Sequence, residues 1–545
     1  MSRMLKSSGA MALATLMSRV LGLVREQVYA WFMGDGAVAS AFKFAYQVPN
    51  LFRRLLGEGA LTAAFIPIFK TRERAEGEKA MWEAANATLS ALVIATLAVV
   101  GLVTVGVSVV LALSEVNYTI DGTAVFPPWP IPILNEDTRL MLRLLRLMFP
   151  YLTLVCLAAL CMGMLNARGI FFLPALGATL LNVVMISTVL FVAPHWGGEL
   201  RQQVFVLGLG ILVAGVAQFT FQLPALFKQG WRFQWVNPRG NPVVREVIVK
   251  MIPGTIGVAA FQINVLLIQA VAFSVDRTIV ASFDYAVRLM EFPQGVFGIS
   301  LATFLLPTLA GIAADKDYDG FRRTLREGLG LLFFLNLVSS VLLVVLATPI
   351  VRLLFERGVF TPDSTQRTAL ALACLAPGLV AFSTVNVVAR AFFALGDTRT
   401  PMRVSVFCLA VNLLISLLLV GPLRQAGLGV ANSLTSFLNV WLLLRALRKK
   451  LKHLDFEPLR PSLLALAGAA VVAGFVAWFA AALWESALGY STLALKVGHL
   501  LVPAMLAGGA YWLLALWLRV SEAKEIAKLA QSLLFRRGGP PGDQA

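Results

Sequence analysis

The chain is patterned as apolar runs of roughly 20 residues or more, separated by joints that hold charged residues, glycine or proline. An α-helix needs about 20 apolar residues to cross a bilayer. The runs lack the roughly ten-residue alternation of a transmembrane β-barrel. We therefore predict an all-α polytopic membrane protein with fourteen transmembrane helices, at 8–33, 37–70, 81–113, 138–165, 172–193, 203–228, 247–274, 278–314, 321–348, 367–395, 402–420, 427–447, 461–486 and 494–519.

The composition leads to the same class of protein. Of the 545 residues, 58% are hydrophobic and only 14% are charged, and the mean hydropathy is +0.79. A soluble core cannot hide so much apolar surface. The first run itself contains Arg19 and Arg25 and continues past any plausible cleavage site, so it is predicted to be the first span and not a signal peptide. The four cysteines lie in apolar runs without metal-ligand spacing and are expected to be buried thiols.

Lysine and arginine collect in every second joint of the chain. The joints after even-numbered helices hold many of them, whereas the joint 114–137 has four carboxylates and no lysine or arginine. Only 349–366 is a basic exception among the alternate joints. Because basic residues stay on the cytoplasmic side, both termini are expected to be cytoplasmic in a bacterial inner membrane. The net charge of +17 is therefore an orientation signal, and no nucleic acid partner is expected.

An internal repeat divides the chain. The segment 41–47 aligns with 282–288, and 59–67 aligns with 298–307 with one gap. These are the second and eighth predicted helices, so the two copies share one topology and form two six-helix lobes around a central cavity. The expected domains are an N-terminal lobe at 1–228, a cytoplasmic linker at 229–246, a C-terminal lobe at 247–450, helices 13 and 14 at 451–520, and a cytoplasmic tail at 521–545.

Charged residues occupy matching places in the two halves. The stretch 48–60 contains Arg53 and Glu58 beside Pro49, and 285–295 contains Arg288 and Glu291 beside Pro293. Charge inside hydrocarbon is costly, so these positions indicate a polar site, to which Arg19 and Arg25 of the first helix also belong. Each guanidinium presents a planar fork of donors that suits a phosphate or carboxylate. The two prolines are expected to break their helices beside the charges.

Structural roles compete with this interpretation. Arg53 and Arg54 lie where their side chains can reach the membrane interface. Arg19 and Arg288 can instead pair with Glu26, Glu58 or Glu291. Lys43 fits an interfacial position as well as a functional one.

Nothing in the chain indicates an enzyme. The three histidines are scattered, and no Gly-rich nucleotide loop is present. No catalytic residue, metal ligand or cofactor is expected. If the protein transports a substrate, the remaining energy source is membrane potential or an ion gradient.

Five motifs resemble those of the MurJ (MviN) family of lipid II flippases, within the multidrug/oligosaccharidyl-lipid/polysaccharide exporter superfamily. The resemblance runs from the first helix to about residue 440, and the last two helices match only in position and apolarity. The motifs are Ser18-Arg-Val-Leu-Gly-Leu-Val-Arg25, Pro49-Asn-Leu-Phe-Arg-Arg54 with Glu58-Gly-Ala60, Arg288-Leu-Met-Glu-Phe-Pro293, Leu354-Phe-Glu-Arg-Gly-Val-Phe360 and Gly396-Asp-Thr-Arg-Thr-Pro401.

The resemblance implies that the chain flips lipid II, an undecaprenyl-pyrophosphate disaccharide-peptide, to the outer leaflet by alternating access. It implies that helices 13 and 14 form a groove for the polyprenyl tail, with membrane lipids and cell-wall synthesis proteins as further partners. Arg19, Arg25, Arg53 and Arg288 correspond to cavity arginines that engage the pyrophosphate, and Glu58 and Glu291 fall on acidic positions of the same motifs.

The chain departs from the family pattern at three places. Ser40 and Val287 stand where an aspartate is expected, which makes the cavity more positive. Sodium-coupled members have an aspartate four residues after the asparagine that corresponds to Asn412. This chain has Ser416 there, which puts a sodium site in question.

Other functions remain open. A flippase for another undecaprenyl-pyrophosphate-linked oligosaccharide is the nearest alternative, because it would share the cationic cavity. A multidrug antiporter would need an acidic, aromatic cavity, and a membrane scaffold would not need buried arginines.

Overall fold

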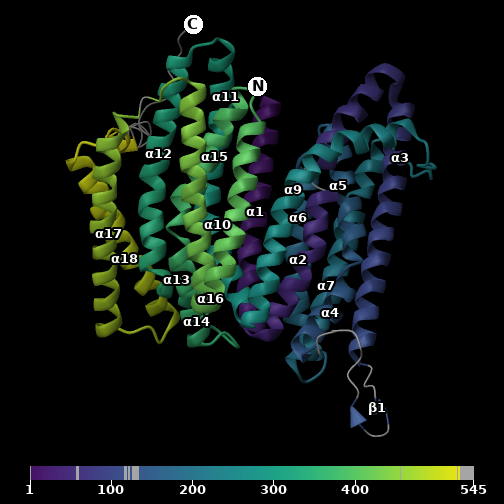
Figure 1. Cartoon of the computed structure of the whole chain (residues 1–545), viewed down its shortest axis with the longest axis horizontal. Coiled ribbons are helices and arrows are strands. Elements are labelled where there is room, and N and C mark those ends of the chain that lie inside the picture. The colour runs from purple at the N-terminus through teal and green to yellow at the C-terminus, as the bar shows by residue number, and fades with distance from the viewer. Residues whose placement is uncertain are drawn as a thin grey trace. The chain divides into compact units, whose positions relative to one another are not determined.

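The protein is helical almost throughout (Figure 1). The computed structural model describes residues 2–56, 60–115, 119–120, 123–124, 134–454, 456–524 and 526–527. Within these ranges, the strands are a small antiparallel pair, β1 (Thr119–Ile120) and β2 (Thr123–Ala124). The prediction of an all-α membrane protein is confirmed at this level.

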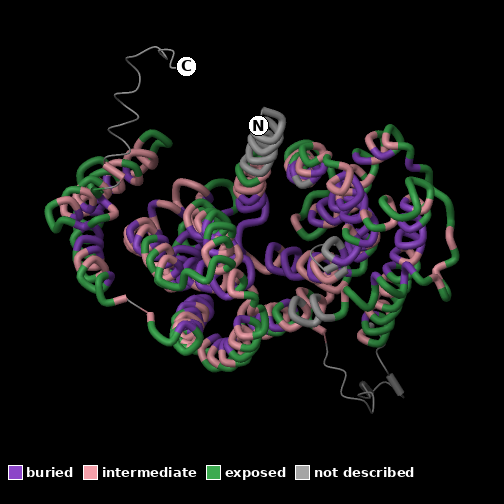
Figure 2. Tube along the Cα trace, turned by 90° about the horizontal axis from the view of Figure 1, so that it is seen from above, coloured by how far each residue is buried: buried purple, intermediate pink, exposed green. Residues whose placement is uncertain are grey.

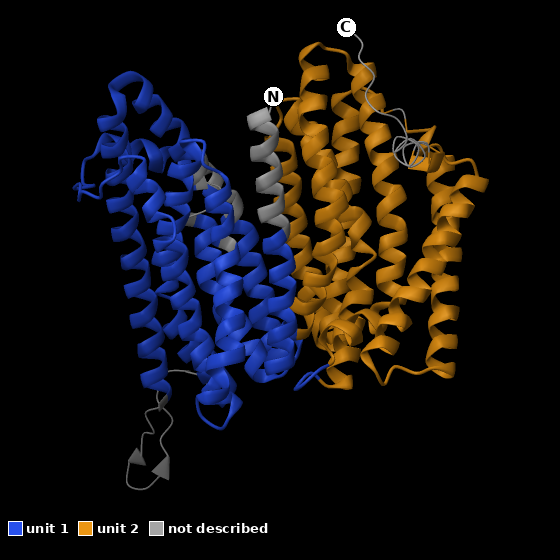
Figure 3. Ribbon diagram, turned by 180° about the vertical axis from the view of Figure 1, so that it is seen from behind, with its two compact units in different colours: residues 1–281, 357–360 blue, residues 282–356, 361–545 orange. Residues whose placement is uncertain are grey.

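The chain forms two compact units (Figure 3). Unit 1 comprises Met1–Ala281 with Arg357–Phe360, and unit 2 comprises Ser282–Glu356 with Thr361–Ala545. The main helices of unit 1 are α1 (Ser2–Met33), α2 (Ala37–Leu56), α3 (Ala60–Glu115), α4 (Glu136–Met148), α5 (Tyr151–Ala167), α6 (Phe172–Ser187), α7 (Leu200–Thr220), α8 (Leu223–Lys228) and α9 (Pro242–Val275). A π-turn η1 (Thr188–Val192) and a 3₁₀ turn η2 (Ala193–His195) follow α6.

Unit 2 contains the second half of the helices. α10 (Ile279–Pro293) crosses the boundary between the units and passes into the π-helix η3 (Gln294–Ile299). The rest are α11 (Ser300–Ala314), α12 (Tyr318–Val345), α13 (Ala347–Phe355), α14 (Pro362–Leu375), α15 (Gly378–Ala394), α16 (Arg399–Lys450), α17 (Leu459–Ala487) and α18 (Leu493–Trp517).

The division between the units does not fall in the predicted linker 229–246. In unit 1, α9 packs against α2 and α3, and the linker itself is tied to α3. The indole of the buried Trp231 donates to Asn86 at 3.0 Å, and Asn86 in turn donates to the carbonyl of Arg232 at 2.9 Å. These contacts place α9 with the helices that precede it. The lobes inferred from the repeat are a separate division and stay a prediction.

A short segment of unit 1, Arg357–Phe360, lies against the end of α1. The Val359 amide donates to the carbonyl of Trp31 at 3.0 Å. Gly358 has a φ of +61°, and a Cβ there would lie 2.4 Å from the same carbonyl oxygen. Only glycine meets both conditions, because it has no Cβ and tolerates a left-handed conformation.

Small residues pack α17 and α18 together and against α12 in unit 2. The buried positions of the pair include Ala469, Ala473 and Ala507. A Cβ on Gly474 would lie 2.6 Å from Val341 of α12, and a Cβ on Gly498 would lie 2.2 Å from the Trp484 ring. Close approach through small residues is the usual way that helices associate in a membrane.

Exposed positions run along many of the helices (Figure 2), and many of the exposed side chains are large and apolar. Leu102 of α3 is 76% exposed and Leu464 of α17 is 74% exposed. By length and composition, eight helices of the described residues can cross a membrane, or up to ten if the bent pairs α4–α5 and α14–α15 each count as one span. Exposed apolar faces of this extent fit contact with lipid.

The structure corrects two local predictions. α2 runs through Pro49 without a break. The predicted joint 349–366 contains most of the short helix α13, which is too short to stand out as an apolar run. The predicted helices 402–420 and 427–447 agree with the structure, because α16 consists of two helical parts that meet at a kink at Arg424 (φ 50°).

Candidate functional site

A buried cluster of charges joins α1 to α2 in unit 1. Glu26, which is 3% exposed, accepts from Arg25 Nη2 at 2.7 Å and from Lys43 Nζ at 2.9 Å. The pairing explains how Lys43 can be 9% exposed, since a buried cation needs an opposite charge. Lys43 is therefore buried in unit 1, where it pairs with Glu26 of the neighbouring helix α1.

The Arg25 guanidinium is only partly engaged by the protein. It lies 5.5 Å from the ring centroid of Tyr29, and the ring favours a cation at its face. Its Nε is buried and makes no hydrogen bond within the described part of the chain. Buried donors are normally satisfied. The Arg25 guanidinium therefore has a hydrogen-bond donor, Nε, that is available to an anionic group.

Arg19 lies six residues before Arg25 on α1, about 9 Å along the helix axis and roughly 120° around it. It is exposed and forms no ion pair or hydrogen bond with the residues that the structure describes. The neighbouring carbonyl of Ser18 accepts from Asn182 of α6 at 3.1 Å, which fixes this part of α1 against α6. Arg19 is thus held on a packed helix while its own charge stays accessible.

Arg53 lies near the end of α2, half-buried. Its Nε donates to the Asn50 side chain at 2.9 Å, one helical turn earlier. This bond ties the guanidinium to the preceding turn of α2. Glu58, the acidic candidate of the same motif, lies outside the described residues.

Arg288 and Glu291 lie on α10 within unit 2. Arg288 Nη1 pairs with Glu291 Oε2 at 3.0 Å, and the two side chains are 37% and 49% exposed. One turn earlier, Tyr285 is fully buried against Phe355, with ring centroids 5.1 Å apart. The buried tyrosine anchors this part of α10, while the charged pair remains accessible.

The structure brings Arg25 together with Glu26 and pairs Arg288 with Glu291. Arg53 donates to Asn50 of its own helix, and the arginines of α1 and α2 belong to a different unit from Arg288. Sequence reasoning did not assign the ion pair between Glu26 and Lys43. The two residues are 17 positions apart, which matches no helical spacing that would have signalled the pair.

One of the departures from the family pattern, Ser40, has a structural role. The Ser40 hydroxyl is buried and accepts from the Ala281 amide at 3.1 Å, so it satisfies one of the free amides at the start of α10. Asn412 lies 3.5 Å from the Thr435 hydroxyl within α16, and Ser416 Oγ has no hydrogen-bond partner among the described residues. No group of three or more His, Cys, Asp or Glu side chains could hold a metal ion in the described part of the chain.

Exposed apolar side chains and eight to ten apolar helices among the described residues define a polytopic membrane protein. The fold is similar to that of an inward-facing multidrug resistance MATE family transporter of the MOP superfamily, with a TM-score of 0.64, 14% identity, and coverage of 81% of this chain and 99% of that one. It is more similar to a lipid II flippase MurJ in an inward closed conformation, with a TM-score of 0.75, 20% identity, and coverage of 93% and 97%.

The sequence comparisons identify the family. The model of the MurJ family, described as lipid II flippase MurJ, matches residues 29–498. The probable lipid II flippase MurJ of Vibrio cholerae is 35% identical over 486 residues, which cover 87% of this chain and 89% of the relative. The lipid II flippase MurJ of Burkholderia cenocepacia is 35% identical over 474 residues, covering 86% and 88%. The chain belongs to the MurJ family, and the resemblance seen in its motifs is confirmed.

Proposed function

We propose that the protein is a lipid II flippase of the bacterial inner membrane and not an enzyme. The family match across residues 29–498 is the observation that carries this function. The physical task fits a transporter, because the anionic sugar-peptide head of lipid II is costly to move through hydrocarbon while the polyprenyl tail need never leave it.

The proposed architecture has fourteen spans, with two six-helix lobes, two further helices and both termini in the cytoplasm. Ten spans are counted when both bent pairs are included. One of the remaining four comes from dividing α16 at Arg424. The other three are α1, α9, and α2 taken together with the first part of α3, each counted as one span. The break in α3 at Gly77, with a φ of 87°, supports that last division. Helices α17 and α18 supply the proposed groove for the tail.

The proposed substrate site uses Arg19, Arg25, Arg53 and Arg288 to bind the pyrophosphate. The free Nε of Arg25 and the exposure of Arg19 support this role. Glu291 orients Arg288 from the next turn, and we assign Glu58 to the same set from its motif alone. Guanidinium groups bind phosphate oxygens through paired hydrogen bonds, which is stronger than a single contact.

The proposed mechanism is alternating access. An inward-open state captures the pyrophosphate on the arginines, the lobes rock, and the head group is released outside. Membrane potential or a counter-ion then resets the cationic cavity, with no cofactor in the cycle.

The test of this site is complementation of a flippase-depleted strain. Arg19→Ala, Arg25→Ala and Arg288→Ala are each expected to abolish growth while the protein remains in the membrane at wild-type level. As a control for lost positive charge, Arg239→Ala alters an exposed residue of the linker 229–246 and is expected to support growth. Normal growth with all three arginines replaced would refute the proposed site.

A further inference from the structure

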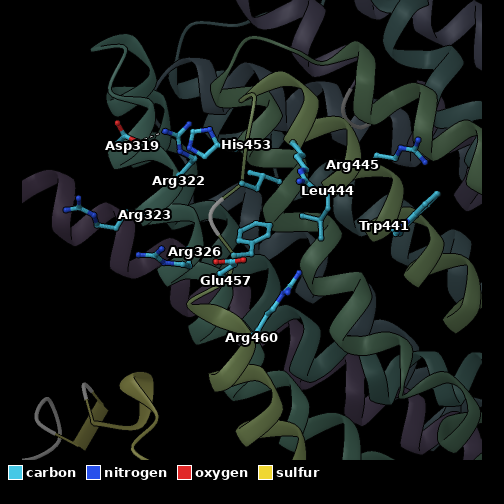
Figure 4. Close-up of a pocket in the computed structure, with 13 residues that line it drawn as sticks. Asp319, Arg322, Arg323, Arg326, Trp441, Leu444, Arg445, His453, Glu457 and Arg460 are labelled. Atoms are coloured by element: carbon cyan, nitrogen blue, oxygen red, sulfur yellow. Dashed lines mark hydrogen bonds and ion pairs between the residues drawn. The ribbon is translucent and has the colours of Figure 1, made fainter.

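A large basic cavity lies within unit 2, and none of the proposed substrate arginines lines it (Figure 4). Its volume is about 1160 Å³. The walls come from the first turns of α12, the last turns of α16, the joint 451–458 and the start of α17. These segments include two of the basic joints that the positive-inside pattern assigns to the cytoplasmic side.

The lining of this cavity is strongly cationic. Six arginines contribute to it, against the two carboxylates Asp319 and Glu457. Asp319 pairs with Arg322. The side chains of Arg323, Arg448 and Arg460 are exposed and form no ion pair with the residues that the structure describes. Uncompensated guanidiniums from three different segments therefore surround one space, where an anion can meet more than one of them.

The cavity also has an apolar side. Leu444, Leu454 and Phe456 line it and pack on the buried cluster that joins α12, α16 and α17. Trp441 stands at its edge, 54% exposed, with the Arg445 guanidinium 5.4 Å from its ring centroid. A ligand in the cavity would thus meet positive charge and apolar surface together.

The apolar surface continues away from the cavity along α16. Phe437 lies one turn before Trp441 and is 48% exposed. Tryptophan with arginine is typical of the interface between hydrocarbon and head groups. An amphiphile with a phosphate at one end and acyl chains at the other matches this order of groups.

We propose that this cavity binds the phosphate head group of an anionic phospholipid from the cytoplasmic leaflet, with the acyl chains lying along the exposed face of α16. Guanidinium forks bind the phosphodiester, and the rim tryptophan marks the level at which the chains begin. The size suits a head group with part of its glycerol and chains, since ligand sites commonly occupy roughly 300–1,000 Å³. This lipid site shares no residue with the proposed substrate site.

The test measures lipid bound to the purified full-length protein in detergent. Phosphatidylglycerol is titrated against phosphatidylcholine, and bound lipid is counted by native mass spectrometry. The variant Arg323→Gln/Arg448→Gln/Arg460→Gln removes three cavity charges. The variant Lys228→Gln/Arg239→Gln/Arg245→Gln removes three exposed charges from the basic segment around the linker of unit 1 and serves as the matched control.

The wild type and the control are expected to bind phosphatidylglycerol in preference to phosphatidylcholine. The cavity variant should bind phosphatidylglycerol about fivefold more weakly for each charge removed, or roughly a hundredfold in total. Equal affinity of the cavity variant and the wild type would overturn the proposal. Binding of inorganic pyrophosphate with no preference for phosphatidylglycerol would also overturn it, because the site would then serve a soluble anion. If the triple variant does not fold, the single variant Arg448→Gln is measured against Arg239→Gln, and equal affinities again overturn the proposal.

Discussion

In the buried cluster of Arg25, Glu26 and Lys43, replacing Glu26 by a neutral side chain is expected to lower the stability of the protein strongly. Glu26→Gln keeps the size of the side chain and removes the charge that both cations face at 2.7 and 2.9 Å. Breaking a buried ion pair on one side costs about 3–5 kcal/mol, because the other charge is left without compensation. For a unit of this size, that corresponds to a fall in the melting temperature of roughly 6–10 °C.

The assay is thermal unfolding of the purified protein in detergent, followed by fluorescence-detected size-exclusion chromatography. Glu291→Gln is the matched control, because it removes the same charge from a pair whose side chains are 37% and 49% exposed. A pair so exposed contributes about 0–1 kcal/mol. Adding Lys43→Met to Glu26→Gln should restore part of the loss, since it removes the stranded cation. If Glu26→Gln is no more damaging than Glu291→Gln, or if Lys43→Met adds to the loss, the cluster does not stabilise unit 1 in this way.

Two further substitutions test the joints between helices. Gly358→Ala places a Cβ 2.4 Å from the Trp31 carbonyl oxygen. Gly489→Ala is the control, because Gly489 has a similar φ (+68°) and a Cβ there meets nothing within 4 Å. Gly358→Ala should therefore lower the free energy of unfolding by roughly 1–3 kcal/mol more than Gly489→Ala, measured by thermal unfolding. Equal losses would show that the contact with Trp31 is unimportant. Asp397 accepts from Lys450 at 2.8 Å, which holds the pKa of that carboxyl well below its usual range. The wild type should therefore be more stable than Asp397→Asn, with the full difference present above about pH 4 and lost as the pH falls through the lowered pKa. A difference in stability that does not change with pH would contradict this.

Hydropathy predicted the helical segments well. Runs such as 321–348 and 461–486 correspond closely to α12 and α17, because burial in a membrane demands a long apolar run. The joints at 71–80 and 421–426 between predicted helices contain Gly77 and Arg424, whose backbone conformations interrupt α3 and α16. Pro49 lies inside a continuous α2, so a proline alone did not identify a break.

The charged residues were found from the sequence, but most of their partners were not. Arg288 and Glu291 are three residues apart, so their pairing follows from helical geometry. The contact of Lys43 with Glu26 depends on how α1 packs on α2 and has no local signal. The arginines of the joints were interpreted only as an orientation signal. Their convergence on one cavity in unit 2 requires the positions of three separate segments.

The most direct test of the central claim is flipping by the purified protein in proteoliposomes. Fluorescent lipid II and an undecaprenyl-linked O-antigen unit are incorporated separately, and their appearance in the opposite leaflet is followed with a membrane-impermeant quencher. The wild-type protein is expected to move lipid II faster than the O-antigen unit, and Arg25→Ala is expected to abolish the movement of lipid II. Movement of the O-antigen unit but not of lipid II, or of neither, would contradict the assignment as a lipid II flippase.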